Sequence, residues 1–257
     1  MNINRIASAF GINSGNLNFT ECTIGHINNT YFVKSSPKLP GPEFVFQKIN
    51  TDIFKNPENL MENIFNVTLH IRKKLIQEGK DPSRGTLEFL KTTDGKYGYN
   101  TKEDGYWRVY RYIDNVLSLN SADTPEVFGK SGFAFGNFQR QLADFDASLL
   151  HETIVNFHNT VSRLQDFKKA LNDDIAGRKN SIQREINFVL DRADKCSYIT
   201  DGIASGKFPL RVTHNDTKLN NLLIDKDTGE GICILDLDTV MPGSALDAPN
   251  RIESPKS

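Results

Sequence analysis

Alternation between apolar and polar side chains marks the first part of the chain and predicts extended strands. In the stretch 43–49, Phe44, Phe46 and Lys48 fall on one face of such a strand, whereas Val45 and Ile49 fall on the other. Short runs of β-branched or aromatic residues, bounded by turn residues, occupy residues 17–25, 30–34, 43–49, 86–92, 97–100 and 105–113. We therefore expect a small, mostly antiparallel sheet.

A helical spacing of apolar residues appears between and after these runs. Asn56 and Pro57 form an N-cap and first-turn pair, and Gly79 ends the pattern that follows them. The apolar face of this helix consists of Leu60, Ile64, Val67, Ile71 and Leu75. Further helices are predicted over 128–145, 152–171 and 181–198, and short strands over 210–213, 222–224 and 232–237.

Together these patterns predict an α+β chain with two lobes. Residues 1–113 form a lobe with an antiparallel sheet and one long helix. Residues 114–243 form a mainly helical lobe with a hairpin near its end, and residues 244–257 are an irregular tail.

Charge and cysteine content narrow the functional classes. The 31 Lys and Arg residues nearly balance the 32 Asp and Glu residues, so the chain lacks the basic field that binds nucleic acid. Its apolar runs are too short to cross a bilayer. The 3 cysteines are widely scattered, which fits a reducing compartment better than a disulfide framework. We therefore expect a cytoplasmic protein with neither a nucleic-acid nor a membrane partner.

Polar residues gather between two apolar strands late in the chain. His214, Asp216, Lys218 and Asn221 lie on one short loop, and Asp236 follows on the next strand. A loop of this composition is usually only a polar turn. However, a carboxylate that accepts a hydroxyl proton, a cation for a moving phosphate and oxygen ligands for Mg²⁺ are the groups that phosphoryl transfer requires.

This segment resembles the catalytic loop of the protein-kinase-like phosphotransferases, especially the aminoglycoside/choline kinase superfamily. Other stretches are similar to the N-acetylhexosamine 1-kinase group in particular: residues 25–31, 47–51, 54–57, 157–160 and 236–243. The resemblance extends over nearly the whole chain to about Gly243. It implies a two-lobed, protein-kinase-like fold that binds ATP and Mg²⁺. The implied reaction transfers the γ-phosphoryl group to a hydroxyl of a small molecule, in this group the anomeric hydroxyl of an N-acetylhexosamine.

The same resemblance implies roles for the loop residues. Asp216 corresponds to the general base, and Lys218 to the lysine that steadies the transferred phosphoryl group. Asn221 and Asp236 correspond to the residues that hold Mg²⁺, and Asp238 is a further candidate for the same cluster. His214 is expected to brace the loop through hydrogen bonds rather than to take part in the chemistry.

Nucleotide contacts are expected from a loop between the first two strands. Gly25, Asn28 and Thr30 occupy the place of the loop that covers the phosphates, although this loop has a single glycine. An ordinary hairpin turn explains the segment equally well.

The remaining nucleotide contacts come from a strand, a helix and the boundary between the lobes. Lys48 is placed like the lysine that reaches the α- and β-phosphates, with an exposed edge lysine as the alternative. Glu62 is the expected ion-pair partner of Lys48, and Glu58 is the alternative partner. Tyr112 and Ile113 lie where the resemblance implies the adenine-binding hinge.

The tail departs from the resembled group, which continues with further helices. Residues 244–257 are polar, contain two prolines and show no helical period. We therefore expect an incomplete second lobe in which the apolar faces of 152–171 or 181–198 are exposed.

Three alternatives stay open. The chain could be a choline, homoserine or aminoglycoside kinase, because the catalytic loop does not distinguish these acceptors. It could also be a truncated, inactive module that binds a nucleotide, or a purely structural α+β domain.

Overall fold

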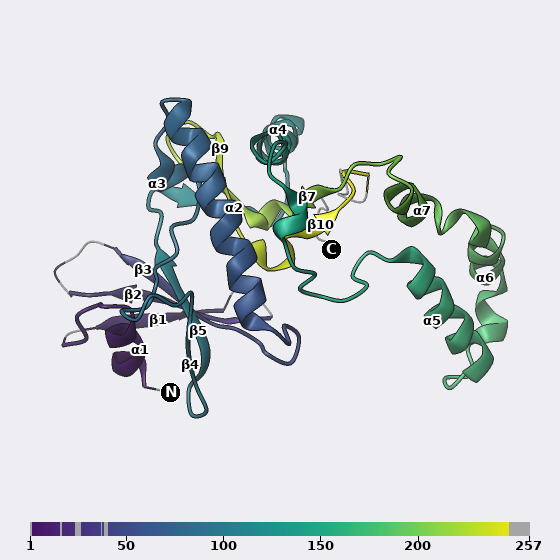
Figure 1. The fold of residues 1–257 in the computed structure, drawn as a ribbon, viewed down its shortest axis with the longest axis horizontal. Helices are drawn as coiled ribbons and strands as arrows, with labels where there is room; N and C mark the ends of the chain where they lie inside the picture. The colour runs from purple at the N-terminus through teal and green to yellow at the C-terminus, as the bar shows by residue number, and fades with distance from the viewer. Residues whose placement is uncertain (1, 16, 24–26, 37, 39–40, 247–257) are drawn as a thin grey trace.

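The computed structural model describes residues 2–15, 17–23, 27–36, 38 and 41–246 and contains a five-stranded antiparallel sheet in its first part (Figure 1). The strands of this sheet, in spatial order, are β1 (Asn18–Cys22), β2 (Asn29–Lys34), β3 (Phe44–Lys48), β5 (Gly105–Arg111) and β4 (Tyr99–Thr101). The strand predicted over 86–92 is wrong, because that segment makes only an isolated bridge between Phe89 and Tyr110.

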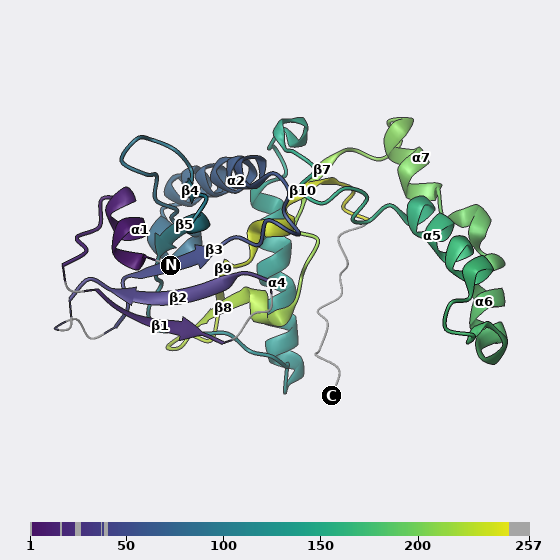
Figure 2. The same cartoon turned by 90° about the horizontal axis from the view of Figure 1, so that it is seen from below.

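Helices cover both faces of this sheet (Figure 2). The helix α1 (Ile3–Ala9), which the sequence patterns did not reveal, packs on Phe44, Phe46 and Trp107. The helix α2 (Pro57–Gln77) covers the opposite face. It begins as predicted, because the Asn56 side chain accepts a hydrogen bond from the Asn59 N–H at 3.2 Å and proline occupies the first turn. We call this sheet with α1 and α2 the N-terminal lobe.

A short connection, residues 112–115, leads to the elements that we call the C-terminal lobe. Three strands form one small sheet in the order β6 (Val116–Leu117), β8 (Leu222–Asp225) and β9 (Gly231–Ile234). Two others pair as β7 (Arg211–Thr213) and β10 (Met241–Gly243). The helices and 3₁₀ turns flanking these strands are α3 (Pro82–Gly85), α4 (Pro125–Gln141), η1 (Ala147–Leu149), η4 (Leu219–Asn221) and η5 (Leu237–Thr239).

The two lobes share one hydrophobic core. Buried residues of α2, such as Leu60 and Ile64, belong to the same cluster as Phe138 of α4 and Leu222 and Ile234 of the β8–β9 hairpin. Because α2 packs on both the sheet and the hairpin, it fixes the N-terminal lobe against the β8–β9 hairpin.

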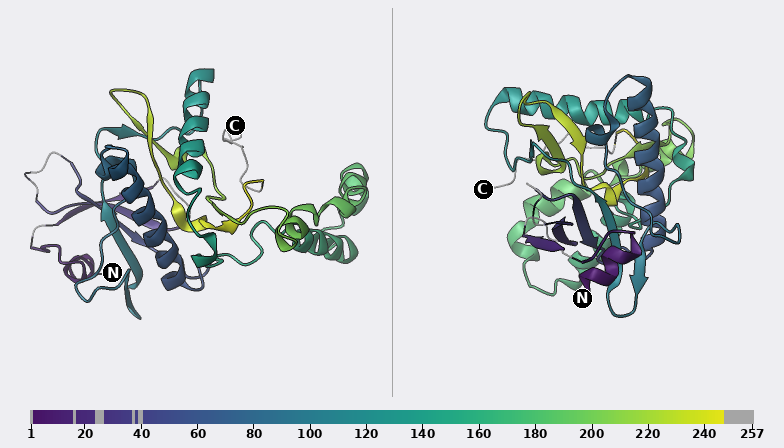
Figure 3. Two further views of the ribbon diagram at one scale, coloured as in Figure 1. Left: turned by 45° about the horizontal axis from the view of Figure 1, so that its top comes forward. Right: turned by 90° about the vertical axis from the view of Figure 1, so that its left-hand side faces the viewer.

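Three helices project away from this core as an arm (Figures 1 and 3). They and their 3₁₀ turns are α5 (Thr160–Asp173), η2 (Lys179–Ile182), α6 (Gln183–Leu190), η3 (Ala193–Lys195) and α7 (Tyr198–Ala204). No described residue of the arm belongs to either core cluster, and large apolar side chains such as Phe188 and Tyr198 are more than half exposed, at 58% each. The expected exposure of apolar residues in this region is therefore observed.

Two helices of the arm differ from the predicted ranges. The segment 152–159 is irregular rather than helical, because Asn156 has a φ of +59° and Asn159 caps α5 by accepting from the Ser162 N–H at 3.1 Å. The predicted helix 181–198 is divided into α6, the turn η3 and the start of α7. Among the described helices, none has both the length and the apolar character needed to span a membrane.

Candidate active site

The loop between β7 and β8 brings together the two predicted catalytic residues and one predicted magnesium ligand. The Lys218 ammonium lies 3.0 Å from Asp216 Oδ1, and both side chains reach solvent. Asn221 donates from Nδ2 to the backbone oxygen of Asp216 at 2.9 Å and to its Oδ2 at 3.2 Å. Asp216, Lys218 and Asn221 therefore form one hydrogen-bonded group, as the sequence pattern predicts.

His214 stabilises this loop from the protein interior. The ring is buried between Phe135 and Phe138, and its Nε2–H donates to the Leu235 carbonyl at 2.8 Å. Its Nδ1 accepts from the Asp216 N–H at 3.3 Å. Burial lowers the pKa of His214 below its usual value, which keeps the ring neutral and able to make both bonds. The expected bracing role is confirmed by these contacts.

Asp236 lies at the end of β9 in a left-handed backbone conformation, with a φ of +54°. The preceding residue is held on both sides, because Leu235 donates its N–H to the Asn221 carbonyl at 2.7 Å and its own carbonyl accepts from His214. These bonds can maintain a conformation that is uncommon for residues other than glycine. They also fix Asp236 next to the loop that carries Asp216, Lys218 and Asn221.

The carboxylate of Asp236 lies near two other acidic side chains. Although water reaches its carboxylate, surrounding protein atoms partly desolvate it, and this is the main cause that raises its pKa to about 7. Repulsion from Asp238 and Asp216 raises the pKa further, while Arg108 and Lys218 lower it. A bound cation would relieve this repulsion.

The residues present fit a magnesium ion that is also held by nucleotide phosphates. The described residues make no hydrogen bond or ion pair to the Asp236 carboxylate or to Oδ1 of Asn221. Among these residues no group of three or more His, Cys, Asp or Glu side chains is arranged to hold a metal. One carboxylate and one amide oxygen suit Mg²⁺, which commonly takes few protein ligands and completes its shell with phosphate and water.

Asp238 has different surroundings from Asp236. It is buried, and its Oδ1 accepts a close hydrogen bond from the Arg108 guanidinium while its Oδ2 accepts from Asn28 Nδ2 at 2.6 Å. Both oxygens are therefore engaged by protein groups. These contacts do not support the predicted role of Asp238 as a magnesium ligand.

The predicted ion pair between Lys48 and Glu62 is wrong. Lys48 shares the α1 face of the sheet with Phe44 and Phe46, so its side chain lies on the side opposite α2. Glu62 instead contacts His151, with 2.8 Å between Oε2 and Nε2. No ion pair to Lys48 occurs among the described residues.

Glu58, the alternative partner of Lys48, is also engaged elsewhere, because it accepts a hydrogen bond from the Tyr106 hydroxyl at 3.0 Å. The aliphatic part of the Lys48 side chain packs over Gly105. A Cβ at position 105 would lie 2.8 Å from Lys48 Cε. The resemblance therefore led to the wrong face of β3.

Two residues that the sequence reasoning missed occupy the α2 face instead. Gln47 lies beside Arg108 in the β3–β5 register, and its Oε1 accepts from Arg108 Nε at 2.9 Å. A charged residue within the apolar run 105–113 was the available signal, since an arginine buried in a strand needs a partner.

The residues predicted to cover the phosphates come from the connection between β1 and β2 and the start of β2. Gly25 falls outside the described residues. Asn28 contacts Asp238, and Thr30 accepts from Gln47 Nε2 at 3.0 Å.

The hinge residues follow β5 directly. Tyr112 donates its N–H to the Glu43 carbonyl at 2.8 Å and packs edge-on against Phe32, with 5.6 Å between the ring centroids. Ile113 is buried in the shared core.

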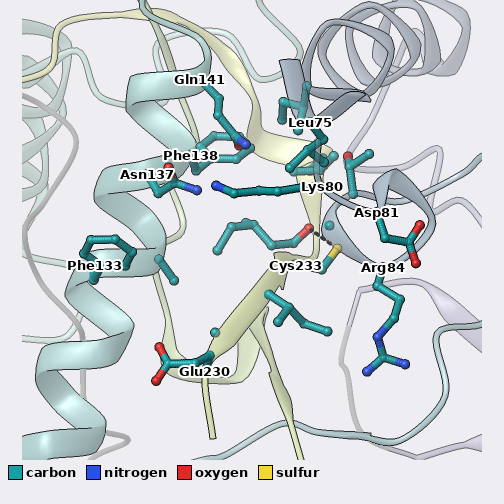
Figure 4. A pocket seen from close by; sticks show the side chains of 18 residues that line it. Leu75, Lys80, Asp81, Arg84, Phe133, Asn137, Phe138, Gln141, Glu230 and Cys233 are labelled. Atoms are coloured by element: carbon teal, nitrogen blue, oxygen red, sulfur yellow. Dashed lines mark hydrogen bonds between the residues drawn. The ribbon is translucent and has the colours of Figure 1, made fainter. Parts of the chain in front are cut away.

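A cavity of about 300 Å³ lies beside the β8–β9 hairpin (Figure 4). It is lined by residues of α2, α3, α4 and β9, and Cys233 lies on its wall. Neither Asp216 nor Asp236 lines it, although Leu237 does. This cavity is therefore separate from the acidic residues of the loop.

Solved structures with a similar fold are phosphotransferases that bind nucleotides. The streptomycin–ATP ternary complex of APH(2")-IIa matches with a TM-score of 0.53 and 14% identity, over 96% of this chain and 72% of that chain. The GDP complex of aminoglycoside 2'-phosphotransferase-IIIa matches with a TM-score of 0.55 and 13% identity, over 88% and 68%. The AMP complex of spectinomycin phosphotransferase APH(9)-Ia matches with a TM-score of 0.55 and 13% identity, over 95% and 71%.

These likenesses establish the two-lobed kinase-like α+β fold that the sequence predicts. The sequence profile of the phosphotransferase enzyme family matches residues 18–246, which include every described element from β1 to β10. The chain therefore belongs to the phosphotransferase enzyme family.

Proposed function

We propose that this protein transfers the γ-phosphoryl group of ATP to a hydroxyl of a small molecule, and that its acceptor is the anomeric hydroxyl of an N-acetylhexosamine. The observation that carries the proposal is the arrangement of the catalytic loop. Asp216, Lys218 and Asn221 contact one another, and the 2.7 Å bond from Leu235 N–H to the Asn221 carbonyl fixes Asp236 beside them.

In the proposed reaction, Asp216 accepts the proton of the acceptor hydroxyl as its oxygen forms a bond to the γ-phosphorus. The bond from that phosphorus to the oxygen it shares with the β-phosphate breaks, and ADP leaves with the electron pair. Lys218 is close enough to Asp216 to hold this carboxylate in place and to interact with the phosphoryl group as it moves. The roles of base and cation thus fall on adjacent side chains.

Asn221 and Asp236 would hold Mg²⁺ through their free oxygens. A bound Mg²⁺ would neutralise negative charge on the nucleotide phosphates. The acidic surroundings of Asp236, which raise its pKa to about 7, favour a cation at this position.

The choice of an amino sugar rests on sequence resemblance, which extends over nearly the whole chain to about Gly243. An aminoglycoside is the second candidate acceptor, because the similar solved structures include complexes named for streptomycin and spectinomycin. The two classes differ in product, since only a reducing sugar yields an anomeric phosphate.

A phosphorylation assay tests both parts of the proposal. The purified protein is incubated with Mg-ATP and, separately, with N-acetylglucosamine, N-acetylgalactosamine, choline, homoserine or streptomycin, and the product is analysed by ³¹P NMR. We expect an anomeric sugar phosphate. The variant Asp216→Asn should lose activity by about a thousandfold or more while still binding ATP.

The matched control is Asp227→Asn, the same change on the exposed β8–β9 turn, where the Asp227 side chain accepts from Asn115 and from no other described residue. This control should retain the parental rate. Equal rates for Asp216→Asn and the parent would refute the assignment of the base. Phosphorylation of streptomycin alone would instead correct the acceptor.

A further inference from the structure

Three strands of the N-terminal lobe send polar side chains toward a single carboxylate of the C-terminal lobe. Arg108 on β5 donates to Oδ1 of Asp238, and Asn28, directly before β2, donates to Oδ2 at 2.6 Å. Gln47 on β3 accepts from Arg108 Nε at 2.9 Å and donates to Thr30 on β2 at 3.0 Å. The result is a continuous hydrogen-bonded chain from three strands to one acid.

The central ion pair is nearly inaccessible to water. The side chains of Arg108 and Asp238 are each 3% exposed, and a further contact joins Arg108 to the Met61 sulfur on α2 at 4.0 Å. Two buried charges of opposite sign contribute little net stability, but loss of one leaves the other uncompensated. A pair of this kind therefore specifies the relative position of the elements that carry it.

The elements held by this pair are those that surround the proposed phosphate site. Asp238 lies in the η5 turn that immediately follows Asp236, and its carbonyl accepts from the Thr153 hydroxyl at 3.1 Å. Asn28 also accepts from the Asn50 N–H at 2.9 Å, which ties the residue before β2 to the end of β3. Fixing Asp238 thus fixes both the turn next to Asp236 and the segment that contains Asn28.

We propose that Arg108 and Asp238 form an ionic latch between the lobes. In this assignment Asp238 is a positioning residue rather than a metal ligand. It orients Asp236 through the η5 turn and holds the Asn28 segment over the nucleotide phosphates. The kinetic part of this inference rests on the proposed function, whereas the link between the lobes does not.

The test compares the latch with a matched ion pair elsewhere in the molecule. Arg5 pairs with Asp104, whose side chain is also 3% exposed, although that of Arg5 is 42% exposed. This pair joins α1 to the β4–β5 turn and, among the described residues, contacts none of the catalytic loop. The variants are Asp238→Asn, Arg108→Met, their double variant and Asn28→Ala, with Asp104→Asn as the control. For each variant we measure kcat, KM for ATP and the Mg²⁺ concentration that gives the half-maximal rate. The assay temperature is well below the Tm of that variant.

We expect Asp238→Asn and Arg108→Met each to lower kcat/KM for ATP by about tenfold or more, and the double variant to be no worse than the poorer single variant. The half-saturating Mg²⁺ concentration should change by less than about threefold. Asn28→Ala, which leaves the ion pair intact, should mainly raise KM for ATP. Asp104→Asn should lower Tm without altering either kinetic constant.

Two results would overturn the latch. The first is a rise of about tenfold or more in the half-saturating Mg²⁺ for Asp238→Asn but not for Arg108→Met, which would identify Asp238 as a metal ligand. The second is unchanged kinetics in all latch variants, as for Asp104→Asn, which would leave the pair a purely structural one.

The link between the lobes is tested without substrate, by measuring the Tm of the same variants in EDTA. We expect the decreases in Tm of the single variants not to add in the double variant. Additive decreases would overturn the latch even if the protein proved not to be a kinase. Conversely, non-additive decreases in a protein that phosphorylates no acceptor would refute only the proposed function.

Discussion

His214 contributes to stability only while its ring is neutral. Burial lowers its pKa from the usual value, and its Nδ1 must accept from the Asp216 N–H. Because protonation is easier in the unfolded chain, this contribution is complete above about pH 6.5 and is lost as the pH falls below that value. Acid therefore weakens the support of the catalytic loop.

The variant His214→Asn tests this pH dependence. At pH 7 the variant should have the lower Tm, because it loses the buried ring and its bonds. Between pH 6.5 and pH 5 the Tm of the parent should fall more steeply than that of the variant, so that the difference narrows. Parallel Tm curves over this range would show that His214 does not titrate on unfolding.

At the level of single residues, the sequence predicted the contacts within the Asp216–Asn221 loop more reliably than the Lys48 ion pair. Asp216, Lys218 and Asn221 are close in the chain, so local geometry brings them together. By contrast, the role of Lys48 depends on which face of β3 meets α2. Both faces of that strand carry apolar residues, because α1 covers one and α2 the other, and alternation alone cannot tell them apart.

Among the secondary-structure elements, α2 has a polar connection to the C-terminal lobe within its apolar face. Asn63 is fully buried and donates from Nδ2 to the His151 carbonyl at 2.8 Å and the Val240 carbonyl at 3.0 Å. Its Oδ1 accepts from the His151 N–H at 2.8 Å. The amide thus joins the helix to two segments that flank the catalytic hairpin.

Replacing this amide by an apolar group should be costly. Asn63→Leu leaves the Val240 carbonyl and the polar groups of His151 without their partners, so we expect the free energy of unfolding to fall by about 2–4 kcal/mol. Urea denaturation measures this change. The control is Asn66→Leu on the same helix, whose half-buried side chain has no hydrogen bond among the described residues and should cost less than about 1 kcal/mol. Equal costs would show that the three bonds of Asn63 are not the cause.

Helix boundaries in the C-terminal lobe were harder to predict than helix α2. The apolar spacing continues through 152–159, yet Thr153 and Ile154 are held by contacts with Asp238 and Met241. Those contacts are distant in sequence and override the local helical pattern. The N-cap of α2, in contrast, is a bond between Asn59 and Asn56, which are close in the sequence, so the local sequence predicts it.

On the scale of the whole molecule, the arm α5–α7 differs from the body in how it is stabilised. The body is held by a core that spans both lobes and by a second cluster between α1 and the sheet, whereas α5 buries none of its residues and α6 buries only Ile186. Sections with few buried apolar contacts open more easily than the core. The arm should therefore unfold locally while the catalytic loop stays intact.

Native-state hydrogen exchange followed by mass spectrometry measures this difference. Amides of α5–α7 should exchange at least about tenfold faster than those of α2 and β5. Similar protection in the arm and in α2 would mean that the arm is stabilised as part of the same cooperative unit.

The central claim is that the loop around Asp216 and the end of β9 form one phosphoryl-transfer site. A crystal structure with Mn²⁺ and a non-hydrolysable ATP analogue tests it most directly, because the anomalous signal locates the metal. We expect Mn²⁺ bonded to Asp236 and Asn221, with Asp216 facing the terminal phosphate and Asp238 still paired with Arg108. A nucleotide bound with its metal away from Asp236 and Asn221 would contradict the account.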